Sequence, residues 1–212
     1  MSVTFWLVRH GLKESACGDV PLTSAGVRQA QATAAFLKSR PLSAIVASPL
    51  RRARETAELS SREIGLRPFE DKRLRERMNW GDVPGQTFEE FAAVWERCTR
   101  EPDRAPPCGG DSARQAANRM RDALQDWAQR QAPGSEIAFF THGGLITDFL
   151  ALMLDVEQLN AVNPDFIAVQ SLLIPECSVT ELIVEKGKYR LGSFADTRHL
   201  TNLLPSPDSC SN

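Results

Sequence analysis

The sequence lacks the features that direct a chain to a membrane or to nucleic acid. No apolar run approaches the length of about 20 residues that a membrane-spanning helix needs. The apolar stretch at residues 2–8 is shorter than the core of a signal peptide and follows no basic segment. The formal net charge of -2 at pH 7 gives no bulk attraction to polyanions. We therefore expect a cytoplasmic protein that contacts neither membrane nor nucleic acid, in which any site for an anion is local.

Cysteine is present without a pattern that favours disulfides or zinc. The five cysteines are an odd number at scattered spacings, with no Cys-x-x-Cys pair and no histidine placed to complete a zinc set: Cys17, Cys98, Cys108, Cys177 and Cys210. We expect reduced thiols. A catalytic cysteine stays open as an alternative, although none of the five lies in a recognisable nucleophile turn or Gly-rich loop.

The sequence is rich instead in short apolar runs that lead into amphipathic helices. Residues 3–8, 43–47 and 137–140 have the β-branched and aromatic character of strands buried on both faces. A helix is expected after each strand: one capped by Thr23, one capped by Ser48 with Pro49 at its first position, and one at residues 145–154. Three strand-to-helix units favour an α/β fold with a mostly parallel sheet.

Two further helices and a β-rich end are also expected. Thr87 begins a capping box, and another helix starts at about residue 111. The first of these helices carries an apolar stripe that we expect to pack within a lid: Phe88, Phe91 and Trp95. Additional strands are predicted at residues 167–174, 178–184 and 189–194.

Each of the three predicted strands is followed by a cationic or cation-capable side chain. These are Arg9 and His10, then Arg52, then His142 with Gly143 and Gly144. The carboxyl ends of parallel strands meet at one edge of a sheet, where the free amides of helix N-termini attract anions. The sequence therefore predicts an anion pocket at this edge. The guanidinium group of arginine can donate hydrogen bonds to two oxygens at once, which suits a phosphoryl group in particular.

His10 is the candidate nucleophile of this pocket. A neutral imidazole nitrogen attacks phosphorus in line when its other ring nitrogen donates to a fixed acceptor. We expect a backbone carbonyl to be that acceptor. His142, beside the same phosphate, is expected to be a proton-bearing stabiliser. His199 is interpreted as structural, and Lys13 either contacts the phosphate or is solvated.

Four segments together resemble the histidine phosphatase superfamily, also called the phosphoglycerate mutase-like family. They are Leu7-Val8-Arg9-His10-Gly11, residues 48–57, residues 140–144, and Leu74-Arg75-Glu76 followed by Gly81-Asp82. The resemblance runs from residue 3 to residue 200. It implies a three-layer α/β/α fold with a mostly parallel central sheet and helices on both faces, formed by a single domain over residues 1–204. Residues 78–110 would be a lid-like insertion, and residues 205–212 a disordered tail.

The resemblance also implies a reaction and the residues that perform it. His10 would take the phosphoryl group, while Glu76 protonates the leaving alkoxide and then deprotonates the attacking water. The phosphate would be bound by Arg9, Gly11, Arg52, His142 and Gly143. No metal and no other cofactor is implied, because arginines and histidines supply the charge stabilisation. The expected activity is hydrolysis of the phosphomonoester of a small metabolite.

Departures from the family pattern leave alternatives open. The segment after Glu76 is longer than in relatives, which keeps Asp82 as the second candidate acid. Leu12 stands where relatives carry an acidic or amide residue, so a phosphate-binding domain with weak turnover is one alternative function. Phosphoglycerate mutase activity is the other alternative function, although mutases of this family usually carry a longer insertion than residues 78–110. Neither the organic part of the substrate nor the oligomeric state follows from the sequence.

Overall fold

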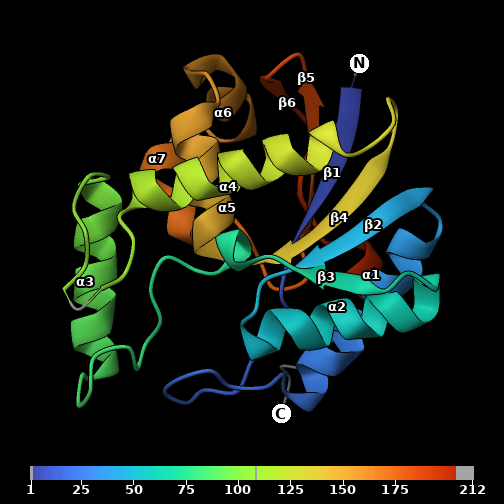
Figure 1. The fold of residues 1–212 in the computed structure, drawn as a ribbon. Coiled ribbons are helices and arrows are strands. Elements are labelled where there is room, and N and C mark those ends of the chain that lie inside the picture. The colour runs from blue at the N-terminus through green and yellow to red at the C-terminus, as the bar shows by residue number, and fades with distance from the viewer. Residues whose placement is uncertain (1, 108, 204–212) are drawn as a thin grey trace, which may run out of the picture.

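The computed structural model describes residues 2–107 and 109–203, and it places a six-stranded sheet between two groups of helices (Figure 1). The expected three-layer α/β/α fold is confirmed. The strand order is β3 (Pro68–Glu70), β2 (Leu42–Ala47), β4 (Glu136–Thr141), β1 (Ser2–Arg9), β5 (Val179–Glu185) and β6 (Lys188–Asp196). The tail at residues 205–212, which was expected to be disordered, lies outside the described residues, as do Cys108 and Cys210.

The strands that carry the candidate site run parallel. β1 pairs with β4, β4 with β2 and β2 with β3 in parallel, whereas β5 and β6 are antiparallel additions beside β1. In this register Val8 lies opposite Phe140, and Phe140 lies opposite Ala47. β1, β2 and β4 therefore end together. The residues that follow them meet at one edge of the sheet, as the sequence predicted.

The two faces of β1 lie against different helix layers. Phe5 and Leu7 are buried against α4 (Ala113–Gln129) and α5 (Gly143–Met153). Trp6 and Val8 are buried on the opposite side, with α1 (Ser24–Lys38) and α2 (Arg51–Ile64). Figure 1 shows both helix pairs against the sheet. A strand covered on both sides explains why its apolar run has almost no polar alternation.

Local sequence explains where several helices begin and end. Thr23 caps α1 by accepting the N–H of Gly26, as predicted. α3 (Phe88–Arg100) begins with the predicted capping box, formed by Thr87 and Glu90. α2 ends at Gly65, whose φ of 83° lies in the left-handed region that favours glycine.

Residues 167–174 do not form the strand that the sequence predicted. They form α7 (Phe166–Val169) and a 3-10 turn, η2 (Gln170–Leu172). The buried side chains of this segment are four residues apart: Phe166, Gln170 and Ile174. That spacing is the period of a helix and not of a strand, which explains why a run judged by its β-branched content was assigned wrongly.

α3 lies outside the two helix layers, beside the end of α4 (Figure 1). The remaining elements are α6 (Val156–Val162) and the 3-10 turns η1 (Lys72–Leu74) and η3 (Arg198–Leu203). Among the described residues, no helix combines the length and the apolar character needed to cross a bilayer.

Candidate functional site

His10 follows β1 directly and is 5% exposed. Its Nδ1 lies 2.8 Å from the carbonyl oxygen of Gly11, which can only accept a hydrogen bond, so Nδ1 carries the proton. The expected backbone acceptor is therefore present, and Nε2 keeps its lone pair. Burial, and then the charges of Arg52 and Arg9, lower the pKa of His10 well below 6.5. The ring is thus neutral near pH 7, with Nε2 able to act as a nucleophile.

Arg52 reaches His10 from the first turn of α2. Its Nε donates to the lone pair of Nε2 of His10 at 3.1 Å, and its Nη2 donates to Oδ1 of Asn79 at 2.9 Å. Nη1 is buried and has no partner among the described residues. The neighbouring Arg51 pairs instead with Glu55 at 2.7 Å, as their spacing of four predicts. Arg52, and not Arg51, therefore faces the site.

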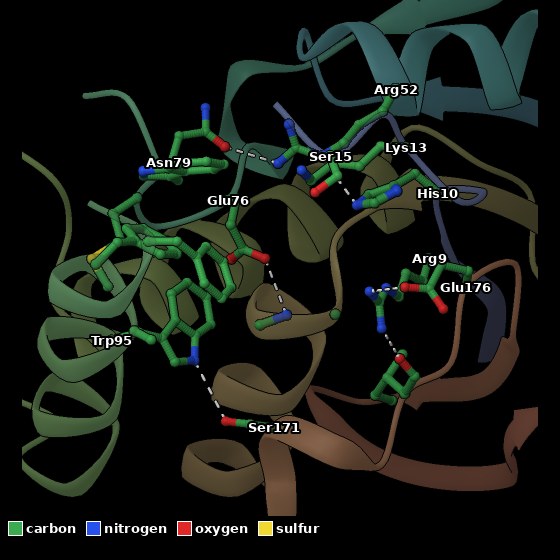
Figure 2. A pocket seen from close by; sticks show the side chains of 18 of the residues that line it. Arg9, His10, Lys13, Ser15, Arg52, Glu76, Asn79, Trp95, Ser171 and Glu176 are labelled. Carbon is green, nitrogen blue, oxygen red and sulfur yellow. Dashed lines mark hydrogen bonds and ion pairs between the residues drawn. The ribbon is translucent and has the colours of Figure 1, made fainter. Parts of the chain in front are cut away.

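Arg9, the last residue of β1, is held by two groups that the sequence did not indicate. Its guanidinium donates to the carbonyl of Ile174 and pairs with the carboxylate of Glu176 (Figure 2). Its Nε is buried without a partner in the described part of the chain. Gly143 packs against this side chain, since a Cβ there would lie 3.3 Å from Cδ of Arg9. Glu176 stands 167 residues from Arg9 in an irregular segment, so neither spacing nor periodicity could reveal the pair.

His142 follows β4, and its ring packs edge to face on His10 at a centroid distance of 5.2 Å. Its Nε2 lies 2.8 Å from Oγ of Ser48, which also accepts the N–H of Leu50 at 3.3 Å. This arrangement favours a hydroxyl that donates its hydrogen to Nε2, which puts the ring proton on Nδ1. Nδ1 is buried and unpartnered among the residues described. Burial, followed by the charge of Arg52, lowers the pKa of His142 well below 6.5.

Ser48 was predicted to cap α2, and that prediction is wrong. α2 begins at Arg51 after Leu50, whose backbone is extended, and no side chain caps it. The N–H of Ser48 continues the sheet by donating to the carbonyl of Phe140 at 2.9 Å. This bond keeps Ser48 beside β4, where its hydroxyl contacts Nε2 of His142 and also accepts the N–H of Leu50, the residue before α2. The serine is therefore a site residue that the capping signal obscured.

Of the two candidate acids, Glu76 faces the site. Its Oε2 accepts the N–H of Gly144 at 3.1 Å, and its Oε1 accepts the N–H of Arg77 at 3.0 Å. The Glu76 carboxylate lines the same cavity as His10 and Arg52 (Figure 2). Asp82 instead accepts the N–H of Asn79 at 2.7 Å and is not among the described residues that line this cavity.

The site is a cavity of about 520 Å³ at the carboxyl edge of the sheet. Three cations line it, Arg9, Lys13 and Arg52, together with the carboxylates of Glu76 and Glu176. Burial is the main cause that lowers the pKa of Lys13, and the nearby charges of Arg52 and Arg9 lower it further. Such a group of cations attracts an anion. Within residues 2–107 and 109–203, no group of three or more His, Cys, Asp or Glu could hold a metal ion.

Gly11, His142 and His199 are not among the described residues that line the cavity. Gly11 donates its N–H to Oγ1 of Thr56 at 3.1 Å, and its carbonyl accepts a hydrogen bond from Nδ1 of His10. Both backbone polar groups of Gly11 therefore already have partners within the protein. Direct contacts from Gly11 and His142 to a ligand stay predictions, whereas the contact of each with the His10 ring is present. Nε2 of His199 lies 3.1 Å from the carbonyl of Cys177, in agreement with a structural interpretation.

The apolar stripe of α3 packs within residues 78–110, the segment expected to be a lid, and it also lines the cavity. Phe88, Phe91 and Trp95 line the cavity together with Trp80, and Phe88 is 55% exposed. Cys98 is the buried residue of α3. The stripe's rings pack on one another and on Trp80, as expected, and the same face also lines the cavity, which helical spacing alone does not reveal.

Comparisons with known proteins agree with this geometry. The family model described as histidine phosphatase superfamily (branch 1) matches residues 5–197. An uncharacterized phosphatase, PhoE, of Bacillus subtilis is 27% identical over 205 residues, which cover 93% of this chain and 97% of that protein. A probable phosphoglycerate mutase, GpmB, of Yersinia enterocolitica is 28% identical over 211 residues, which cover 92% of this chain and 94% of that protein.

The fold is likewise similar to solved structures of phosphatases. The native structure of a mycobacterial glucosyl-3-phosphoglycerate phosphatase has a TM-score of 0.71 and 25% sequence identity to this chain. The similarity covers 93% of this chain and 100% of that one. With the family model matched from β1 to the end of β6, the chain belongs to the histidine phosphatase superfamily.

Proposed function

We propose that this protein is a phosphomonoesterase that hydrolyses a small phosphorylated metabolite, without a metal ion, through a phosphohistidine at His10. One observation carries the proposal. Nδ1 of His10 donates to the carbonyl of Gly11, which leaves a neutral Nε2 beside Arg52 in a cation-rich cavity. The phosphatases among the relatives support hydrolysis. The probable mutase supports the alternative, in which His10 returns the phosphoryl group to another hydroxyl of the substrate.

Three unused donors at the site suit the phosphate: two belong to arginines that line the cavity, and one belongs to His142, whose ring packs on His10. Nε of Arg9, Nη1 of Arg52 and Nδ1 of His142 are all buried without a partner in the described chain. Buried polar groups are normally paired, and an unpaired one costs about 1–3 kcal/mol. Phosphoryl oxygens would satisfy all three donors at once. The donors would then stabilise the charge that develops on those oxygens in the transition state.

In the first half of the reaction, Nε2 of His10 attacks phosphorus in line. The bond between phosphorus and the ester oxygen breaks, and its electron pair stays on that oxygen. The acid form of Glu76 gives its proton to the same oxygen, so the organic group leaves as a neutral alcohol. Throughout this step the Gly11 carbonyl holds the Nδ1–H of His10 and stabilises the positive charge that forms on the ring.

In the second half, a water molecule attacks the phosphorus of the phosphohistidine. Its proton goes to the carboxylate of Glu76, which restores the acid form. The bond between phosphorus and Nε2 of His10 breaks, its electron pair returns to the nitrogen, and inorganic phosphate leaves. No metal is needed in either half, because arginine and histidine donors supply the stabilisation that Mg²⁺ provides in other phosphoryl-transfer enzymes.

A substrate panel in EDTA tests the proposed activity. We expect the protein to release phosphate from p-nitrophenyl phosphate, and from at least one metabolite phosphate, at the same rate with and without EDTA. An acid-labile, base-stable phosphate label on the protein is expected during turnover. Folded protein that releases no phosphate from any ester would contradict the proposal. Conversion of 3-phosphoglycerate to 2-phosphoglycerate that outpaces phosphate release would favour the mutase.

Ser48→Ala is expected to lower kcat on p-nitrophenyl phosphate by about two- to tenfold, the value of one hydrogen bond. Without the Ser48 hydroxyl, the proton of His142 distributes between both ring nitrogens, so Nδ1 is no longer always a donor. Ser60→Ala is the matched control, because Ser60 is also buried on the α2 side and its Oγ has no partner among described residues. Nitrogen NMR of the His142 ring reports the tautomer directly. Equal kcat in both variants, with His142 still protonated on Nδ1, would rule out this role.

A further inference from the structure

Four aromatic residues line the cavity besides the cations, Trp80, Phe88, Phe91 and Trp95, which we call the aromatic wall. Neighbouring rings follow one another along it at centroid separations of 5.4, 6.3 and 6.1 Å. Figure 2 shows Trp95 across the cavity from Arg52 and His10, with Glu76 between them. A ligand whose phosphate lies at the cations therefore extends its organic part along the aromatic wall.

The aromatic wall is not buried by the fold itself. Phe88 is 55% exposed, and the other three rings are half-buried. When another apolar surface covers aromatic side chains that were exposed to water, the free energy falls, so such contacts favour binding. A ring or an alkyl group of a ligand would provide that surface.

Trp95 is held in place without a ligand. The guanidinium of Arg77 stacks on its ring, 3.9 Å from the centroid, and its Nε1 donates to Oγ of Ser171 at 3.4 Å. Arg77 is in turn fixed by Asp148, whose Oδ1 accepts from its Nη1 at 2.8 Å in a fully buried ion pair. A surface that is already ordered loses little conformational entropy on binding, so contacts with it contribute more to affinity.

The aromatic wall begins at the proposed acid. A Cβ on Gly144 would lie 2.3 Å from Cη2 of Trp95 and 2.9 Å from Oε1 of Glu76. The edge of the indole and the carboxylate therefore meet over the same glycine. Because Glu76 is proposed to protonate the leaving oxygen, the organic group on that oxygen starts beside Trp95.

The aromatic wall provides no partner for a second anion. The cations among the described lining residues are Arg9, Lys13 and Arg52, and all three lie at the phosphate end. The rest of the lining is apolar or uncharged, apart from the carboxylates of Glu76 and Glu176. A carboxylate or a second phosphate along the aromatic wall would lose hydration without gaining an ion pair.

We propose that the preferred substrate is the phosphate monoester of an alcohol that carries an aromatic ring or a comparable apolar group and no further negative charge. This inference rests on the phosphatase activity proposed above and adds the class of ester that the site selects. It places phosphorylated hydroxy acids, including phosphoglycerates, among the poor substrates.

Two esters with similar leaving groups test the aromatic wall. 2-Phenylethyl phosphate and propyl phosphate both release an unactivated primary alcohol, and they differ in the ring. We expect kcat/KM for the phenylethyl ester to be higher by about tenfold to a hundredfold, as for burial of one aromatic group. 3-Phosphoglycerate is expected to fall below both. Phe88→Ala and Phe91→Ala are expected to reduce the ratio between the two esters.

Phe69→Ala is the matched control for Phe88→Ala. Phe69 is 56% exposed on β3, and it is not among the lining residues of the cavity. Its removal deletes the same side chain at nearly the same exposure, so the ratio between the two esters should keep its wild-type value. A ratio that falls equally in both variants would overturn the role of the aromatic wall.

The corresponding phosphonates separate this inference from the phosphatase proposal, because they bind without being hydrolysed. 2-Phenylethylphosphonate is expected to bind more tightly than propylphosphonate by a similar factor. Turnover of both esters with equal kcat/KM, or a preference for 3-phosphoglycerate, would overturn the inference and leave the phosphatase activity standing. If the protein hydrolyses neither ester but binds 2-phenylethylphosphonate more tightly than propylphosphonate, the result would support the aromatic wall and reject the phosphatase activity.

Discussion

Replacement of His10 by alanine is expected to abolish turnover of every phosphate ester, including the activated p-nitrophenyl phosphate. The change removes the atom that forms the bond to phosphorus. The neighbouring His142 is a poor substitute, because its Nε2 meets Ser48 and its Nδ1 carries a proton in that arrangement. We expect kcat to fall by about 10⁴-fold or more, and the acid-labile phosphate label to disappear.

Two further variants separate the loss of chemistry from a loss of folding. His10→Gln restores part of the buried volume, and it should be as inactive as His10→Ala while unfolding at a temperature closer to wild type. His199→Gln changes a histidine that does not line the cavity, so the label should persist there. Folded His10→Ala that retains kcat within tenfold of wild type would show that another group attacks phosphorus.

The strand ends were the most predictable part of this molecule. Arg9 ends one buried strand, Arg52 and His142 follow two others, and the parallel register of β1, β2 and β4 brings all three to one edge of the sheet. The backbone acceptor for His10 was likewise expected from chemistry, since a nucleophilic imidazole needs its other nitrogen fixed. Only the acceptor's identity, the carbonyl of Gly11, had to come from the structure.

The missed features depend on contacts that local patterns do not encode. Glu176 reaches Arg9 from an irregular segment 167 residues away. Ser48 carries a strong capping signal, yet α2 begins three residues later, the N–H of Ser48 donates to Phe140 of β4, and its hydroxyl contacts His142. The stripe of α3 has the right period for a buried face, but that face lines the cavity. In each case the sequence defines the local element, and the tertiary partner decides what its side chains do.

Glu76→Gln is expected to affect substrates unequally, according to how much their leaving groups need a proton. For an alkyl ester such as propyl phosphate, formation of the phosphohistidine should slow by about 10²–10⁴-fold, the usual contribution of a general acid. For p-nitrophenyl phosphate the same step should change little, because p-nitrophenolate leaves without protonation. Rapid-mixing experiments that follow the first turnover measure this step for each ester.

The second half of the reaction gives the same variant a separate signature. The water that attacks the phosphohistidine needs Glu76 as a base, whichever ester supplied the phosphoryl group. With p-nitrophenyl phosphate, the variant should therefore show a fast burst of p-nitrophenolate followed by slow turnover. Phosphorylated protein should accumulate during the slow phase. Asp82→Asn is the matched control, because Asp82 accepts one N–H from Asn79 and does not line the cavity. Equal first-turnover losses for both esters, without a burst, would show that Glu76 has a structural role towards Gly144 and Arg77. A burst in Asp82→Asn would assign the proton transfer to Asp82 instead.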